Sequence, residues 1–307
     1  MNDPRNLYAL VGDHFEVPLG LPMIAGLTGF SDAGSTIAQV ADTIFSSFDS
    51  ELVVKFNNDE LLDYRSRRPI LFFERDHIAS YEPPVLGIYL IHDDANQPFL
   101  YLHGYEPDFK WETFVQAIIQ VTDLFAVSSV TWVHSIPFPT PHTRPISTTV
   151  SGNRRDLIDR ISEWKPSTQV PGNVLHLLEF ELSKEQVPII GFVLLVPHYL
   201  SDSEYPQAAV TAFEQLAAAT GLVFKTDPLR DEGIKFNAKI AKQVEENADL
   251  QRMIQNLELG YNSAENAPMR TQIVRPASEV PSAEEIAAEL EDFLATRRKN
   301  SVDEDEA

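Results

Sequence analysis

The chain of 307 residues contains no cysteine. That absence excludes disulfide bonds, thiolate metal ligands and a cysteine nucleophile. Long hydrophobic runs are also missing: the longest, PIIGFVLLVP at 188–197, is too short to span a bilayer and is typical of a buried strand. The first residues, MNDPRNLYALVGDHF, lack the basic-then-apolar profile of a secretory signal. We therefore expect a soluble, cytoplasmic protein.

Basic residues are scarce. The chain has 24 lysines and arginines against 46 acidic residues, a net charge of −22. A surface this negative repels phosphate backbones and anionic lipids, so we expect neither nucleic acid nor membrane as a partner. The short basic clusters RSRR (65–68) and RR (154–155) are interpreted as charge on solvated loops. The acidic end SVDEDEA (301–307) is predicted to be a disordered tail.

Hydrophobic residues make up 43% of the chain, enough for a sizeable core. The apolar pattern predicts a strand at 22–29, a helix at about 35–47 and a strand at 51–56, which together form a βαβ unit. The runs 70–73, 85–91 and 99–104 are interpreted as antiparallel additions to that sheet.

The alternation then repeats. We predict a helix from Trp111 to Phe125, strands at 128–136, 173–180 and 189–196, and a helix at 206–220 that begins with Pro206 and ends before Gly221. This order predicts an α/β fold with three layers, α/β/α, around a mostly parallel or mixed sheet.

The strand signal disappears after residue 225. Apolar spacing over 231–261 is helical but slips near 246–249, which predicts two short helices. We expect a linker at 262–281 and a final amphipathic helix that begins with a capping box at Ser282. The predicted domains are an α/β/α core at 1–225, a small helical region at 226–300 and the acidic tail at 301–307.

The stretch GFSDAGST at 29–36 resembles the phosphate loop G-x-x-x-x-G-K-[ST], except that Ser35 stands where the lysine belongs. Asp32 adds a carboxylate that repels triphosphate. The favoured interpretation is that Ser31 or Asp32 caps the following helix. A weaker anion or a substrate hydroxyl at the helix end remains an alternative. The related nucleophile motif G-x-S-x-G is incomplete, because Ala33 takes its last position.

A second unusual stretch, HSIPFPTPHTRP at 134–145, contains four prolines and presents His142 and Arg144 directly after a predicted strand. Ligands of open α/β sheets gather where parallel strands end, so these loops could share one rim. The candidate residues of this rim are Ser31, Asp32, Ser35, Glu106, His142, Arg144 and His198. They suit either acid–base chemistry or a polar protein-binding surface. Arg144 could instead pair with Asp32 or Glu106 and hold the loops together.

No pair of histidines has the H-x-x-x-H spacing of a metal site, so we expect no metal and no cofactor.

Four motifs in their order along the chain resemble the proteasome assembly chaperone 2 superfamily, in its actinobacterial form. They are GFSDAG (29–34), EPDFKW (106–111), PTPHTRP (139–145) and VPHY (196–199), and the resemblance covers about residues 20–225. It implies an α/β/α fold similar to purine nucleoside phosphorylases and peptidyl hydrolases, a helical C-terminal segment, and homo-oligomers, specifically trimers. Some members carry an ATP-grasp label. Eukaryotic relatives help to assemble proteasome α-rings, and the family offers no agreed catalytic residues.

Two hypotheses for the function follow. The first is a non-enzymatic factor for protein assembly or interaction, whose partners are further copies of itself and other proteins. The alternative is a small-molecule enzyme of hydrolase or phosphorylase type that uses Asp32, His142 and Arg144 on the rim. We favour the first, because the stiff proline loop suits recognition and no catalytic signature is complete.

We predict that the protein does not bind ATP with useful affinity, because Ser35 replaces the lysine and Asp32 adds like charge. Calorimetry with magnesium and millimolar ATP is expected to give no binding heat. A micromolar dissociation constant would contradict the prediction.

Overall fold

The computed structural model describes residues 3–12, 16–162 and 167–265. The expected linker beyond 265, the helix from Ser282 and the tail 301–307 lie outside these residues. Contacts divide the chain into two units, the first comprising 1–165 and 171–269. Of the second unit only 167–170 are described, and they form neither helix nor strand. Among the described helices, none is long and apolar enough to cross a membrane.

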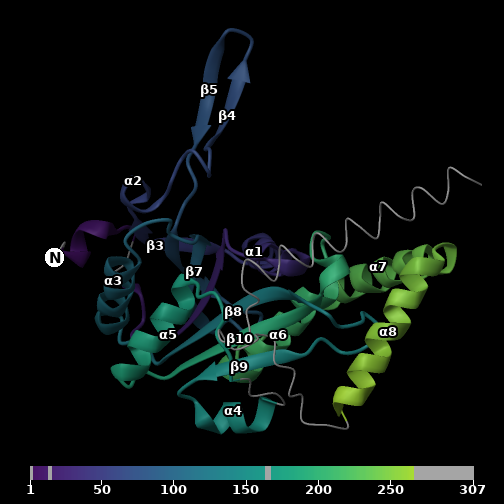
Figure 1. Ribbon diagram of the computed structural model, residues 1–307. Coiled ribbons are helices and arrows are strands. Elements are labelled where there is room, and N and C mark those ends of the chain that lie inside the picture. The colour runs from purple at the N-terminus through teal and green to yellow at the C-terminus, as the bar shows by residue number, and fades with distance from the viewer. Residues whose placement is uncertain (1–2, 13–15, 163–166, 266–307) are drawn as a thin grey trace, which may run out of the picture. The chain divides into compact units, whose positions relative to one another are not determined.

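The centre of the first unit is a mixed eight-stranded sheet (Figure 1). Its order is β1 (Tyr8–Leu10), β3 (Ser50–Phe56), β6 (Gly87–His92), β7 (Pro98–Tyr105), β2 (Pro22–Thr28), β8 (Ser129–Phe138), β10 (Ile189–Pro197) and β9 (Thr148–Gly152). The four strands β7, β2, β8 and β10 are parallel, and the remaining neighbours pair antiparallel. The predicted three-layer α/β/α fold with a mixed sheet is confirmed.

Helices cover both faces of the sheet. One face packs on α3 (Trp111–Leu124) and α5 (Val174–Lys184), the other on α1 (Thr36–Ser47), α4 (Arg155–Ile161) and α6 (Pro206–Thr220). The bounds of α6 are those predicted from Pro206 and Gly221. Short turns of helix complete the unit: η1 (Pro4–Leu7), η3 (Ala33–Ser35), α2 (Asn58–Leu61) and η4 (His198–Leu200).

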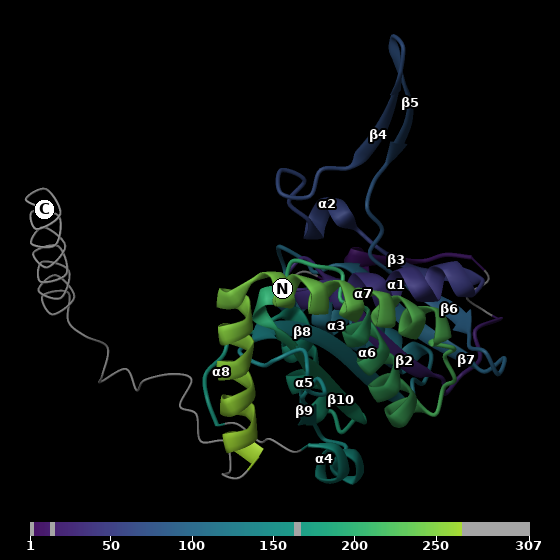
Figure 2. The same cartoon turned by 90° about the vertical axis from the view of Figure 1, so that its right-hand side faces the viewer.

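Two helices follow the sheet, α7 (Asp227–Glu246) and α8 (Ala248–Glu265), as the slip in apolar spacing predicted (Figure 2). They belong to the same compact unit as the sheet. Phe236 of α7 packs on Tyr205, and Ile240 and Ile254 are buried. The predicted division at residue 225 is therefore a change of element type within one unit.

The strand expected at 173–180 is wrong, because this segment begins α5. Asn173 caps the helix: its side chain accepts from the His176 amide at 2.9 Å, and His176 Nδ1 accepts from the Asn173 amide at 3.1 Å. The buried positions 174, 175, 178 and 182 have helical spacing. The short apolar run resembled a strand, and the cap decides for a helix.

The strand expected to extend the sheet at 70–73 does not join it. β4 (Ile70–Glu74) pairs only with β5 (His77–Glu82) in a separate two-stranded sheet, and every residue of both strands is exposed. In both views this hairpin stands clear of the main sheet (Figures 1 and 2). The βαβ expectation is also modified: β2 and β3 run in the same direction, but β6 and β7 lie between them.

Gly191 of β10 is required by its neighbour Trp132 of β8. A Cβ at this position would lie 2.2 Å from the buried indole ring. We expect Gly191→Ala to lower the free energy of unfolding by about 1–3 kcal/mol, because the overpacked indole must move. Urea denaturation measures this. Gly172→Ala is the control, since a Cβ there has no atom within 4 Å, and equal stability of the two variants would contradict the account.

Candidate functional site

Four parallel strands end at one edge of the sheet, and the loops that follow them form the rim. It consists of the loop after β2 (29–35), the segment after β7 (106–110), the proline loop after β8 (139–147) and η4 after β10. Every candidate residue predicted from the sequence lies in one of these segments. These segments follow parallel strands and so lie at one edge of the sheet, and the contacts of each side chain decide what that edge can do.

Asp32 caps helix α1. Its Oδ1 and Oδ2 accept from the amides of Ile37 and Ala38 at 2.8 and 3.1 Å, and Ser135 Oγ donates to Oδ1 at 3.1 Å. The capping interpretation is confirmed, with Asp32 as the acceptor. The helix end that would attract a phosphate already faces a carboxylate.

The remainder of this loop is also held by hydrogen bonds. The Gly34 amide donates to Ser201 O at 2.8 Å, and Gly34 O accepts from the Tyr205 amide at 2.9 Å. Gly34 has φ +71°, a left-handed conformation that favours glycine. The carbonyls of Gly34 and Ser35 accept from Gln39 Nε2 at 2.7 and 3.2 Å. Ser31, at the start of the loop, is half-buried.

Glu106 caps the N-terminus of α5, as Asp32 caps that of α1. The side chain is buried, and Oε1 accepts from the Val174 amide at 2.7 Å. Burial raises the pKa of the Glu106 carboxyl, while the Val174 amide and Arg67 oppose the rise. A carboxyl with a raised pKa can act as an acid, but this one is directed into a helix end.

His142 and Arg144 contact two other elements. Tyr199 Oη accepts from the His142 amide at 2.8 Å and lies 2.7 Å from His142 Nδ1. Burial lowers the pKa of His142, with Glu258 opposing the shift, so a neutral ring that accepts the phenol proton fits this contact. Arg144 Nη1 lies 3.4 Å from Glu258 Oε1 of α8, and Thr143 Oγ1 donates to the same oxygen. Arg144 therefore pairs with Glu258 and not with Asp32 or Glu106, the partners considered from the sequence.

His198 is exposed, and its ring meets the Tyr199 ring edge-on at 5.5 Å. Asp32, Glu106, His142 and Arg144 therefore each bond to a different element, and the contact of His142 with Tyr199 connects two of the rim segments. A reacting centre would need a nucleophile, a base and a stabilising group aimed at one point. Whether the candidates also bind a ligand or partner stays a prediction.

Two further residues of this edge were not among the predicted candidates. Arg67, assigned to a solvated cluster, has a side chain only 13% exposed and pairs with Asp108. His134 of β8 is 2% exposed and stacks on the ring of Phe30 at 5.4 Å, and its Nε2 has no hydrogen-bond partner among the described residues. Burial, with His176 nearby, lowers the pKa of His134 to about 4. The position of His134 inside the apolar run TWVHSI was the feature of the sequence that could have indicated its burial.

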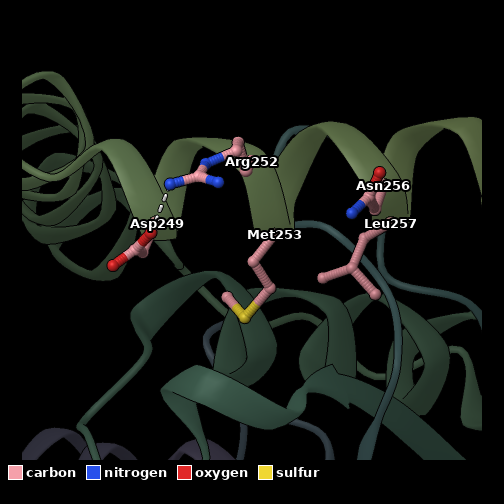
Figure 3. Close-up of a pocket in the computed structure, with 5 residues that line it drawn as sticks. All are labelled: Asp249, Arg252, Met253, Asn256 and Leu257. Atoms are coloured by element: carbon pink, nitrogen blue, oxygen red, sulfur yellow. Dashed lines mark hydrogen bonds and ion pairs between the residues drawn. The ribbon is translucent and has the colours of Figure 1, made fainter. Parts of the chain in front are cut away.

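A cavity of about 490 Å³ lies elsewhere, on α8. Its lining residues are Asp249, Arg252, Met253, Asn256 and Leu257, and Figure 3 shows Met253 and Leu257 on one side of the helix, with Arg252 paired to Asp249. The ion-pair distance is 2.7 Å. No candidate rim residue lines this cavity. Among the described residues, no group of three or more His, Asp or Glu could hold a metal ion.

Comparison with known proteins identifies a family and several similar structures. The PAC2 family model matches residues 26–244. A Mycobacterium tuberculosis protein of unknown function is 35% identical, with 85% of this chain and 90% of that chain covered and a TM-score of 0.79. A protein of unknown function from Corynebacterium glutamicum is 32% identical, with coverage of 84% and 98% and a TM-score of 0.80.

A more distant structure, a proteasome-assembly chaperone homologue from M. tuberculosis, is 18% identical, with coverage of 76% and 100% and a TM-score of 0.70. At this identity the likeness is one of fold. A comparison with proteins of curated function gives no match.

The buried His134 predicts a pH dependence of stability. Its folded pKa, about 4, lies below the ordinary value of 6.5, so the unfolded chain binds the proton more readily. The free energy of unfolding is then highest above pH 6.5 and falls as the pH drops towards 4. Between pH 6.5 and 5.5, one such histidine lowers the free energy of unfolding by about 1 kcal/mol.

Urea denaturation at pH 7.5, 6.5 and 5.5 measures this change in the free energy of unfolding. His134→Phe is expected to flatten the dependence by that amount, because the phenyl ring binds no proton. Ile234→Ser is the control, since Ile234 is 69% exposed and the substitution removes no titrating group, so the dependence should stay unchanged. Equal pH dependence of wild type and His134→Phe would contradict the assignment.

Proposed function

The chain belongs to the PAC2 family, and from that premise we propose that it is a non-enzymatic factor that acts through contacts with other proteins. The fold shared with a proteasome-assembly chaperone homologue supports a chaperone-like role in assembly. Its partners on this proposal are further copies of the chain, as a homotrimer, and other proteins. The resemblance noted in the sequence implies the trimer.

The observation that carries the proposal is the β4–β5 hairpin. Six large apolar side chains on it are 47–72% exposed: Ile70, Leu71, Phe72, Phe73, Ile78 and Tyr81. Successive residues of a strand point to opposite sides, so both faces of the hairpin carry apolar groups. A two-stranded hairpin alone is marginally stable, and an exposed apolar patch marks an interaction site. A protein partner that covers the hairpin would remove this surface from water.

The contacts of the rim residues argue against the alternative, a small-molecule enzyme. The enzyme hypothesis relied on Asp32, His142 and Arg144 acting together, but they bond to α1, Tyr199 and α8 respectively. Those bonds would have to break before the three groups could act on one substrate. The cost of freeing a partly buried, paired charge makes that arrangement unfavourable.

The hairpin can be tested for self-association. Light scattering at micromolar concentration is expected to give the wild type a mass that is a multiple of 34.5 kDa. The double variant Phe72→Ser/Phe73→Ser should shift the mass towards the monomer. At a dilution where the wild type is also monomeric, the two melting temperatures should agree, because exposed substitutions usually alter stability by less than about 0.5 kcal/mol.

Ile234→Ser on α7 is the matched control, since Ile234 is 69% exposed and lies outside the hairpin. It should leave the mass unchanged. A wild type of monomer mass, or a double variant of wild-type mass, would contradict the use of the hairpin in self-association.

A further inference from the structure

Both legs of the hairpin are fixed to the main sheet at their base. The returning leg is held by hydrogen bonds: Pro84 O accepts from Asn58 Nδ2, and Leu86 O accepts from the Phe56 amide at 2.9 Å. Gly104 of β7 lets this leg approach, since a Cβ there would lie 2.7 Å from Leu86 Cα and Val85 O. The returning leg is therefore anchored largely through backbone groups.

In the outgoing leg, residues 62–69, Leu62 is buried at the start and the Arg67 side chain makes the ion pair with the rim. Arg67 pairs with Asp108 and lies over the Tyr105 ring, 5.3 Å from its centroid. It also lies directly against Gly29 at the end of β2, where a Cβ would come within 2.6 Å of Arg67 Nη2. One guanidinium thus contacts the ends of two neighbouring parallel strands. Both charged partners are largely buried, which holds the contact more firmly than a surface ion pair.

Asp108 extends this anchor along the leg. Its Oδ2 accepts from the Asp63 amide at 2.7 Å, and its own amide donates to Leu61 O at 2.8 Å. The leg is therefore tied to the rim at both Asp63 and Arg67. Beyond Arg67, Arg68 and all residues of β4 are exposed. Arg67 is the last charged side chain of this leg with a largely buried contact, and the half-buried Pro69 follows before β4 begins.

We propose that Arg67 is a positioning residue that fixes the direction of the β4–β5 hairpin and so determines which partner geometry the hairpin can meet. The inference rests on the proposed function, in that the hairpin is the docking element. An arginine suits the task, because its planar group can pair with a carboxylate and stack on a ring at once. A lysine would keep the charge and lose the stack. The rim is then the support of the docking element, and Gly29 and Tyr105 belong to that support.

Pulsed electron paramagnetic resonance tests the positioning directly. The chain has no cysteine, so two introduced cysteines carry the only spin labels. Asp76→Cys at the hairpin turn and Gln116→Cys on α3 are both exposed. The measurement is made in the Phe72→Ser/Phe73→Ser background, so that no partner holds the hairpin. Arg67→Ala is expected to broaden the distance distribution, and Arg67→Lys to broaden it less.

Arg65→Ala is the matched control, because Arg65 lies two residues earlier on the same leg and is exposed. Asp108→Asn tests the anchor from its other side and is expected to broaden the distribution as well. It also covers the case in which Arg67→Ala fails to fold. Distributions of Arg67→Ala and Asp108→Asn that superimpose on that of Arg65→Ala would overturn the proposal.

Light scattering in the background with Phe72 and Phe73 intact gives the functional readout. If the freed hairpin spends a tenth of its time in the docking direction, each contact made by a hairpin weakens about tenfold, and assembly of several protomers weakens by more. A monomeric wild type would defeat the proposed self-association and leave the positioning result standing. Broadened distances with unchanged self-association would overturn the link between hairpin direction and docking.

Discussion

The carboxylate of Asp32 determines how the edge of the sheet is built. It accepts from two amides of α1 and from the hydroxyl of Ser135, and so joins the first helix to the central strand β8. Hydrogen bonds to an ionised acceptor are about twice as strong as neutral ones. With the helix end occupied in this way, neighbouring loops pack against a fixed turn. Gly34 of this turn bonds to Ser201 after η4 and to Tyr205 before α6.

The same device recurs elsewhere in this acidic chain. Glu106 accepts from the first amide of α5, and Asp93 accepts from the amides of Ala95, Gln97 and Val223. Loops expose backbone amides that need acceptors, and a carboxylate can satisfy several at once. The carboxylates on the rim thus have a structural reason to be there. Their number near the strand ends is a poor indicator of catalysis in this protein.

The sequence predicted what depends on local chemistry. Pro206 and Gly221 placed α6 correctly, and the slip in apolar spacing placed the break between α7 and α8. The segment 173–180 was assigned wrongly, although Asn173 and His176 stood in capping positions beside an apolar run. Arg67 was interpreted wrongly as solvated charge, because its burial depends on Tyr105 and Asp108, about 40 positions away. Contacts of that range leave no periodic signal in one sequence.

The β4–β5 hairpin differs from the remainder of the described fold in one physical respect. The main sheet buries its apolar side chains against helices on both faces, so these side chains need no partner protein to cover them. The hairpin has aromatic and aliphatic groups on both faces, and all of its strand residues are exposed in the part of the chain that the structure describes. Its base is nevertheless held firmly, by Arg67 on one leg and by Asn58 and Gly104 on the other. A flexible apolar loop would collapse onto its own surface, whereas an anchored one is kept available for another protein. This combination places the proposed interaction at the hairpin and gives the strand ends the task of supporting it.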